Sequence, residues 1–255
     1  MNYGGNRVDR SRTTEQSLRA EIVRVGRLMH AKGFVTATDG NISVRLDEDR
    51  FLVTPSGLSK GYMTPAQLVV IDWEARPVGS APDHLKPSSE ILLHLEAYRQ
   101  RPEIGAVVHA HPVHAITLSI AGVPLTRCPI PEVVVNLGMI PTTDYAMPAS
   151  AEGATVIREL IRQYDALILQ RHGSVTVGKN MWEAYLNLEK LENAAEITYK
   201  VLLLGRELPF PPDALEKLLT KREQAGLMAP GQRVELERAY GVGQISVSHE
   251  GSTRR

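Results

Sequence analysis

The sequence has little of several things that would point to a particular class of protein. It contains one cysteine, Cys128, so no disulfide can form within the chain, and a reducing cytoplasmic location is expected. Residues 1–12 are polar, and no segment approaches the roughly 18 uninterrupted apolar residues of a membrane span. We therefore expect neither a signal peptide nor a membrane partner.

The sequence also lacks an excess of charge of either sign. The 29 lysines and arginines balance the 29 aspartates and glutamates, and the formal net charge is +0. This balance gives no basic field that would attract nucleic acid or an anionic membrane. The hydrophobic fraction of 43% is ordinary for a globular protein.

Apolar spacing predicts strands and helices that alternate along the chain without a linker. We expect one α/β domain over residues 1–255, with flexible termini at about 1–12 and 241–255. Strands are predicted at 41–45, 51–54, 68–73, 106–111 and 166–170. Helices are predicted at 13–33, 87–101, 112–120, 151–164, 180–204 and 214–227, with a short helix starting at Thr64-Pro65.

Two histidines end an apolar run at Ala106-Val107-Val108-His109-Ala110-His111. Residues i and i+2 of a strand share a face, so both imidazoles can reach one metal ion. The alternative is one buried and one surface histidine. His172, at the end of another predicted strand and beside Gly173, can supply a third imidazole. His114 is a conceivable ligand, but the chain turns at Pro112 and should point it elsewhere.

Ser88, Ser89 and Glu90 open a predicted helix. The positive end of the helix dipole makes this a possible anion site with a carboxylate beside it, although serine capping and dipole complementation explain the same residues. Two turns of small residues, at 38–41 and 54–57, could hold a phosphate; the alternative is that they only reverse the chain and bind no ligand. A metal, a proton-transferring carboxylate and a phosphate anchor together suit chemistry next to a carbonyl.

Five short segments, in this order, resemble the class II aldolase/adducin family, and most of all its fuculose-phosphate aldolases. The resemblance spans about residues 18–204. The segments are Gly40-Asn41-Ile42-Ser43-Val44-Arg45, Thr54-Pro55-Ser56-Gly57, Pro87-Ser88-Ser89-Glu90, Val108-His109-Ala110-His111 and Gln170-Arg171-His172-Gly173.

The resemblance implies a three-layer α/β/α sandwich around a largely antiparallel sheet, in a homotetramer with active sites at subunit interfaces. It implies Zn²⁺, or another divalent transition metal, as cofactor, and a phosphorylated sugar as substrate. Glu90 would transfer the proton and could also ligate the metal. The implied metal ligands are His109, His111 and His172, and the implied phosphate-binding residues are Gly40, Asn41, Ser56, Gly57, Ser88 and Ser89.

Two family tyrosines have no counterpart here. One belongs in the segment around Cys128–Pro131, and the other falls near Ala225. Since these tyrosines act on the aldehyde half of the substrate, their absence means that the sequence does not predict which aldehyde is released. Glu132, in the same loop as the first, is our candidate for a substitute catalytic acid.

Three functions follow. The first is a zinc-dependent lyase of carbohydrate metabolism that cleaves a ketose 1-phosphate to dihydroxyacetone phosphate and an aldehyde through a metal-stabilised enediolate. The second is decarboxylation of a 3-oxo sugar acid, possibly phosphorylated, with Lys86 and Arg127 as possible carboxylate partners. The third is a non-catalytic interaction module like the adducin head domains, which retention of the histidines and Glu90 disfavours.

Overall fold

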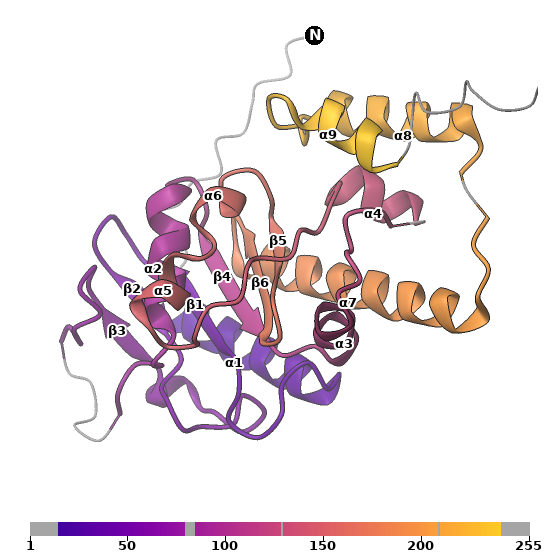
Figure 1. Ribbon diagram of the computed structural model, residues 1–255. Helices are drawn as coiled ribbons and strands as arrows, with labels where there is room; N and C mark the ends of the chain where they lie inside the picture. Colours follow the sequence, from indigo (N-terminus) through magenta and orange to yellow (C-terminus); the bar gives the residue numbers. More distant parts are fainter. Residues whose placement is uncertain (1–14, 80–84, 129, 209, 241–255) are drawn as a thin grey trace, which may run out of the picture.

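A six-stranded antiparallel sheet forms the centre of the computed structural model, which describes residues 15–79, 85–128, 130–208 and 210–240 (Figure 1). The strand order is β3-β2-β1-β4-β6-β5, and every pair of neighbours runs antiparallel. The strands are β1 (Asn41–Arg45), β2 (Phe51–Val53), β3 (Val69–Ile71), β4 (Ala106–Ala110), β5 (Ala166–Leu169) and β6 (Gly173–Gly178).

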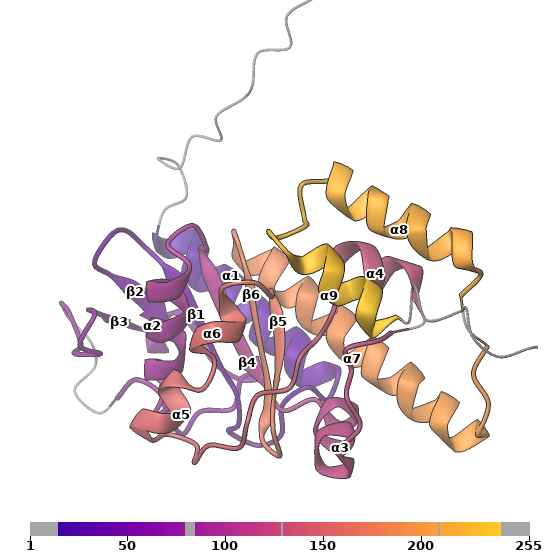
Figure 2. The ribbon, with the colours of Figure 1, turned by 45° about the horizontal axis from the view of Figure 1, so that its top comes forward.

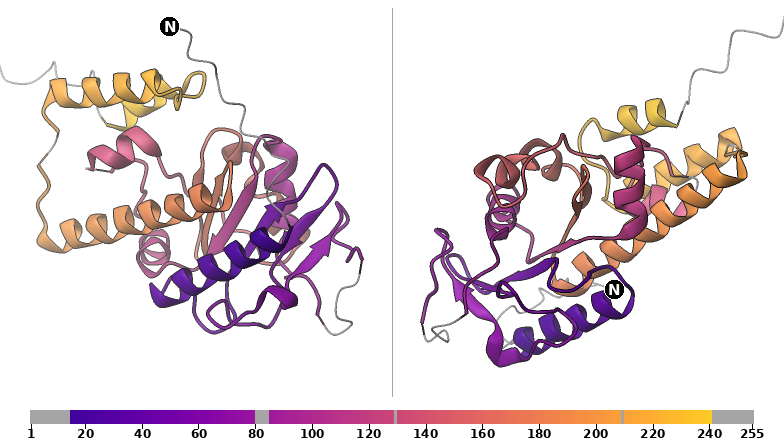
Figure 3. Two further views of the ribbon diagram at one scale, coloured as in Figure 1. Left: turned by 180° about the vertical axis from the view of Figure 1, so that it is seen from behind. Right: turned by 60° about the horizontal axis from the view of Figure 1, so that its bottom comes forward.

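Helices cover both faces of the sheet, as the family resemblance implies (Figures 1 and 3). One face carries α2 (Ile91–Gln100), α5 (Ala151–Thr155) and α6 (Arg158–Ile161). The other face carries α1 (Glu15–Ala31), α7 (Met181–Leu204) and α3 (Val113–Ala121). Among the described helices, none is both long enough and apolar enough to cross a bilayer.

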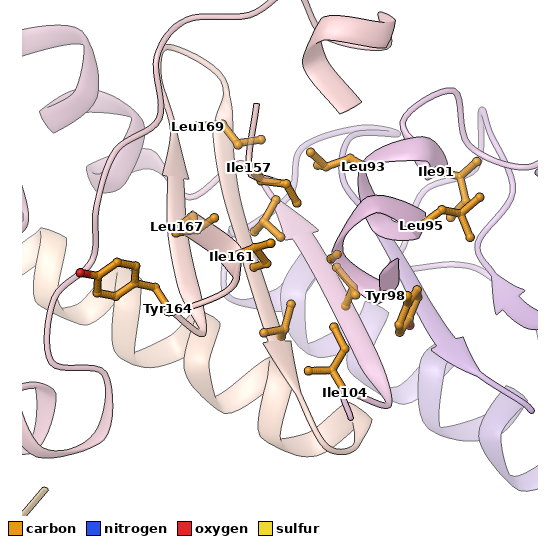
Figure 4. Packing of buried hydrophobic residues seen from close by; sticks show 14 of the residues in the cluster. Ile91, Leu93, Leu95, Tyr98, Ile104, Ile157, Ile161, Tyr164, Leu167 and Leu169 are labelled. Atoms are coloured by element: carbon orange, nitrogen blue, oxygen red, sulfur yellow. The ribbon is translucent and has the colours of Figure 1, made fainter. Parts of the chain in front are cut away.

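Alternation along β4 separates the two hydrophobic cores. Val107 packs with the side chains of α2, whereas Ala106 and Val108 pack with those of α1 and α7. Figure 4 shows the first core, where Leu95 and Tyr98 of α2 lie on the same side of the sheet as Ile157 and Ile161. His109 shares the face of Val107, so β4 directs it toward the α2 layer.

A group of three helices lies beside the end of the sheet where β5 begins: α4 (Pro131–Asn136), α8 (Pro212–Gln224) and α9 (Gln232–Ala239) (Figure 2). Arg222 joins them, donating to the Val135 carbonyl oxygen at 2.8 Å and to the Gln232 side chain. Tyr164, just before β5, donates to Glu235 at 2.6 Å. The group therefore lies at the opposite end of β5 from His172.

Several predicted boundaries are wrong. The helix predicted at 151–164 is two short helices, α5 and α6, joined by αR turns. The helix predicted from 87 begins at Ile91, with Glu90 as its N-cap residue, and the short helix after Thr64 is a 3₁₀ turn (Pro65–Gln67). The last predicted helix ends at Gln224, and α9 was not predicted. The predicted flexible termini lie outside the described residues.

Leu95 and Leu92 of α2 form a matched pair for testing this packing. Leu95 is fully buried and Leu92 is 40% exposed. Leu95→Ala should lower the free energy of unfolding by about 2–5 kcal/mol, because it removes buried methyl groups and leaves a cavity. Leu92→Ala should cost about 0.5 kcal/mol, which is typical of surface positions. Urea denaturation measures both, and equal losses would contradict this orientation of α2.

Candidate metal centre and active site

Four side chains meet at one end of the sheet, with ligand atoms that all lie within 4.8 Å of one another. They are Glu90, His109, His111 and His172. The Glu90 carboxylate bridges two histidines, with Oε2 at 3.2 Å from His109 Nε2 and Oε1 at 3.1 Å from His172 Nε2. His111 Nε2 lies 3.0 Å from His109 Nε2. The structure thus brings together every residue predicted to ligate the metal.

Pairing of β4 with β6 explains why the histidines converge. Ala110 lies opposite Ser174, so the turn before β6 reaches the end of β4 and places His172 beside His111. Gly173 permits this contact: a Cβ atom there would lie 2.3 Å from the Ala110 carbonyl oxygen and 2.9 Å from His111 Cδ2. The close approach expected at Gly173 is present.

The tautomer of His109 follows from its hydrogen bond. Its Nδ1 lies 2.9 Å from the carbonyl oxygen of Ser174, which only accepts, so Nδ1 carries the hydrogen. The Nε2 lone pair then faces the Glu90 carboxylate and His111. A lone pair beside a buried carboxylate needs a cation between them, either a proton, which makes the imidazole positively charged, or a metal ion in its place.

The charge state of the cluster favours metal binding. Burial raises the pKa of Glu90, but hydrogen bonds and the positive charges of His109 and His172 lower it more, to well below its usual value. Burial lowers the pKa of His111, and the charges of His109 and His172 lower it further. Near neutral pH the cluster therefore offers an ionised carboxylate and an uncharged imidazole at His111, the protonation states that metal ions require.

A first-row divalent ion fits this donor set. Ligand atoms about 2.1 Å from a tetrahedral zinc ion stand about 3.4 Å apart. The three closest observed separations, 3.0–3.2 Å, are near that value, and all the ligand atoms lie within 4.8 Å of one another. Three imidazoles and one carboxylate suit zinc and several other transition metals.

The predicted phosphate residues lie to one side of this cluster. Asn41 Nδ2 donates to Ser88 Oγ at 3.0 Å, and the buried Asn41 Oδ1 has no protein partner. Ser88 Oγ in turn accepts the backbone N–H of Glu90 at 3.4 Å, but Glu90 is the N-cap residue of α2 and no side chain caps this helix, so the expected serine cap is absent. Gly40 precedes Asn41, and Ser89 precedes Glu90. The free Asn41 Oδ1 can only accept a hydrogen bond, so a phosphate here would have to bind the second N–H of Asn41 Nδ2.

The second predicted phosphate turn is linked to the same segment. The backbone N–H of Ser56 donates to the Lys86 carbonyl oxygen at 2.9 Å, and Pro55 pairs with Pro87. Ser56 and Gly57 are exposed. Phosphate binding by these residues stays a prediction.

A cleft opens beside Glu90 and His172. Apart from Ser89, sequence reasoning missed its lining, because no motif marks the loop that forms one wall. Gln170 stood inside a matching segment, but we assigned it no role. The polar lining residues beyond the metal cluster include Ser89, Thr143, Asp144, Ser150 and Gln170.

Two further predicted residues lie away from the cluster. Glu132 is exposed on α4, which belongs to the helix group at the other end of β5, so this chain does not bring it to its own metal cluster. Arg127 pairs with Glu207 at 2.8 Å. The catalytic role of Glu132 stays a prediction.

His114 and Cys128 have structural roles rather than roles in the metal cluster. His114 Nδ1 lies 2.8 Å from Glu192, so it points elsewhere, as expected. Cys128 is buried, and burial raises the pKa of its thiol to about 11, which leaves it in the unreactive thiol form.

Comparisons with known proteins point to one family. Residues 20–199 match the family described as "Class II Aldolase and Adducin N-terminal domain". The chain is 32% identical over 203 residues to a 3-oxo-tetronate 4-phosphate decarboxylase of Pectobacterium atrosepticum, covering 78% of this chain and 91% of the relative. It is 33% identical over 179 residues to an L-fuculose phosphate aldolase of Methanococcus maripaludis, covering 70% and 94%.

A solved structure is similar over most of the chain. It is YgbL from Escherichia coli, described as a putative aldolase/epimerase/decarboxylase. The TM-score is 0.72 at 29% identity, covering 81% of this chain and 100% of that one.

The ligand assignment predicts that substitutions of two histidines have different effects on the metal content of the protein. His172→Ala should remove one ligand and reduce the tightly bound divalent ion from about one per chain to near zero. His114→Gln, the matched control, should keep the ion, because His114 pairs with Glu192 instead. Elemental analysis of the purified proteins measures both. Retention of the ion by His172→Ala would contradict the ligand assignment.

Proposed function

The chain belongs to the class II aldolase and adducin family, which confirms the resemblance seen in its motifs, and from that premise we propose a metal-dependent carbon–carbon lyase of phosphorylated sugar acids. The observation that carries the proposal is the bridge that Glu90 makes between His109 and His172. A divalent ion held there would draw electrons from the substrate carbonyl as a Lewis acid. The retained cluster disfavours a purely non-catalytic module.

Substrate phosphate would occupy the side of the cluster formed by Asn41 and Ser88. The Asn41 side chain and the N-terminal end of α2 supply polar groups there, and helix N-termini attract anions. An anchored phosphate fixes the carbonyl relative to Glu90. Orientation of this kind contributes to rate without any further group.

Decarboxylation requires the fewest groups beyond the cluster. When a 3-oxo acid loses CO₂, the electron pair of the broken bond passes to the carbon next to the carbonyl, giving an enediolate. That carbon then gains one proton, and Glu90 is the carboxylate placed to carry it. For 3-oxo-tetronate 4-phosphate the products are CO₂ and dihydroxyacetone phosphate.

Aldol cleavage requires one group more. The hydroxyl on the departing carbon must lose its proton as the aldehyde forms, so a second base has to reach it. Glu132, our predicted candidate, lies on α4, away from the cluster of its own chain. We therefore place decarboxylation first, which reverses the order of the sequence-based hypotheses, and similarity to the Pectobacterium decarboxylase supports this choice.

Aldol cleavage of a ketose 1-phosphate is the second candidate. Similarity to the Methanococcus aldolase favours it, as does the Ser88-Ser89-Glu90 segment. Both reactions pass through the same enediolate and yield dihydroxyacetone phosphate.

We further propose Zn²⁺ as the ion, a cytoplasmic location and a homotetramer with its sites at subunit interfaces. The three-histidine donor set supports zinc. In a tetramer, the exposed Glu132 of one subunit could serve the site of its neighbour.

Direct assay separates the two reactions. The Zn²⁺-loaded protein is incubated with 3-oxo-tetronate 4-phosphate and, separately, with L-fuculose 1-phosphate. Dihydroxyacetone phosphate is measured in both, together with CO₂ in the first and aldehyde in the second. We expect kcat/KM to be at least 100-fold higher for decarboxylation. A preference for aldehyde release would establish the second candidate, and no turnover of either would contradict the proposal.

Glu90→Gln tests the proton carrier. The amide cannot carry the proton, so kcat should fall by about 10²–10⁴-fold. The three histidines should still hold the ion. Glu74→Gln, at an exposed turn after β3, is the matched control and should keep full activity. Wild-type kcat in Glu90→Gln would refute the assigned role.

A further inference from the structure

His109, in β4, and His111, just after its end, have different partners on their second nitrogens. His109 Nδ1 donates to a backbone carbonyl. His111 Nδ1 instead faces a carboxylate, with Asp39 Oδ2 at 3.5 Å. Ligating histidines depend on such a partner, because it fixes the tautomer and the ring orientation. Asp39 is placed to do this for His111.

Asp39 lies on a turn whose backbone is tightly defined. Its N–H donates to the Thr36 carbonyl oxygen at 2.9 Å. Ala37 and Gly40, on either side, have positive φ angles of 49° and 71°. A Cβ atom on Gly40 would lie 2.8 Å from the His109 carbonyl oxygen, so the turn packs closely against the end of β4. Asp39 itself is half exposed and needs this backbone to hold its position.

Lys60 holds the same turn from inside the protein. Its side chain is 1% exposed, and its ammonium donates to the carbonyl oxygens of Thr38 and Leu58, each at 2.7 Å. Burial lowers the pKa of Lys60 to about 8, opposed by the charge of Asp39. Burying an ammonium group is costly, and here the two carbonyl hydrogen bonds and the charge of Asp39 offset that cost.

The backbone around Lys60 is fixed against α1. A Cβ atom on Gly26 of α1 would lie 2.7 Å from the Lys60 carbonyl oxygen, and one on Gly61 would lie 2.6 Å from the His30 ring. The Lys60 ammonium therefore extends from a firmly seated turn to the residue that precedes Asp39.

We propose that Asp39 and Lys60 are positioning residues of the metal centre: Lys60 fixes the Thr38 carbonyl, and Asp39 thereby keeps the hydrogen of His111 on Nδ1 and its Nε2 lone pair on the cluster. This inference rests on the metal site of the proposed function. It extends the site to two residues that supply no ligand atom to the cluster.

Metal affinity measures this role without any substrate. Zn²⁺ binding to the metal-free protein is measured by competition with a chromophoric chelator. Asp39→Ala and Lys60→Met should each weaken binding by about 10–100-fold. Asp39→Asn should lose less, because its amide oxygen can accept the N–H of His111 in place of the carboxylate. The Asp39→Ala/Lys60→Met double variant should be no weaker than the weaker single variant, because both act through one contact.

Matched surface residues serve as controls. Asp49→Ala, on the exposed β1–β2 turn, and Lys32→Met, which breaks an exposed ion pair with Glu189, should bind Zn²⁺ within about 2-fold of wild type. Melting temperatures of the metal-free variants separate a general loss of stability from a change at the site.

The outcomes are distinct. Wild-type Zn²⁺ affinity in Asp39→Ala would overturn the inference and leave the proposed function standing. A lower melting temperature with unchanged affinity in Lys60→Met would make Lys60 purely structural and also overturn it. Failure of the wild-type chain to bind Zn²⁺ would overturn the proposed function together with this inference.

Discussion

The hydrogen-bonded pairing of β4 with β6 is the constraint on which the site depends. It sets Ala110 opposite Ser174, brings the β5–β6 turn to the end of β4 and gives His109 the Ser174 carbonyl as partner. Without this register, His172 would not reach the two histidines of β4. The packing of α2 on the same face then brings Glu90, its N-cap residue, to the three imidazoles.

Two polar regions with different chemistry adjoin the cluster. Asn41 and Ser88 form a polar edge next to the start of α2, which suits an anion. A cleft with Thr143 and Gln170 is also lined by Ser89, Glu90 and His172. A substrate anchored by its phosphate at the polar edge would extend its reacting bond past Glu90 toward the cleft. Substrate choice therefore depends on the cleft and on whatever an adjoining subunit adds to it.

Local sequence patterns predicted which side chains meet at the cluster. The spacing of His109 and His111 needed only the period of a strand, and Gly173 signalled the close approach of His172. Features set by tertiary contacts were not predictable in this way. The helix expected at 151–164 breaks in two, and α9 is held by the contacts of Arg222 and Tyr164 with residues distant in sequence. The role of Asp39 could be inferred only once the fold placed it beside His111. In the same way, only the fold shows that Glu132 lies on α4, away from the cluster of its own chain.

The central claim is that Glu90 and the three histidines hold one divalent ion. X-ray absorption spectroscopy of the Zn²⁺-loaded protein tests it most directly. The account predicts an ion with three imidazole nitrogens at about 2.0–2.1 Å and an oxygen completing the shell. A spectrum with sulfur ligation or fewer than three imidazoles in the wild-type protein would contradict it.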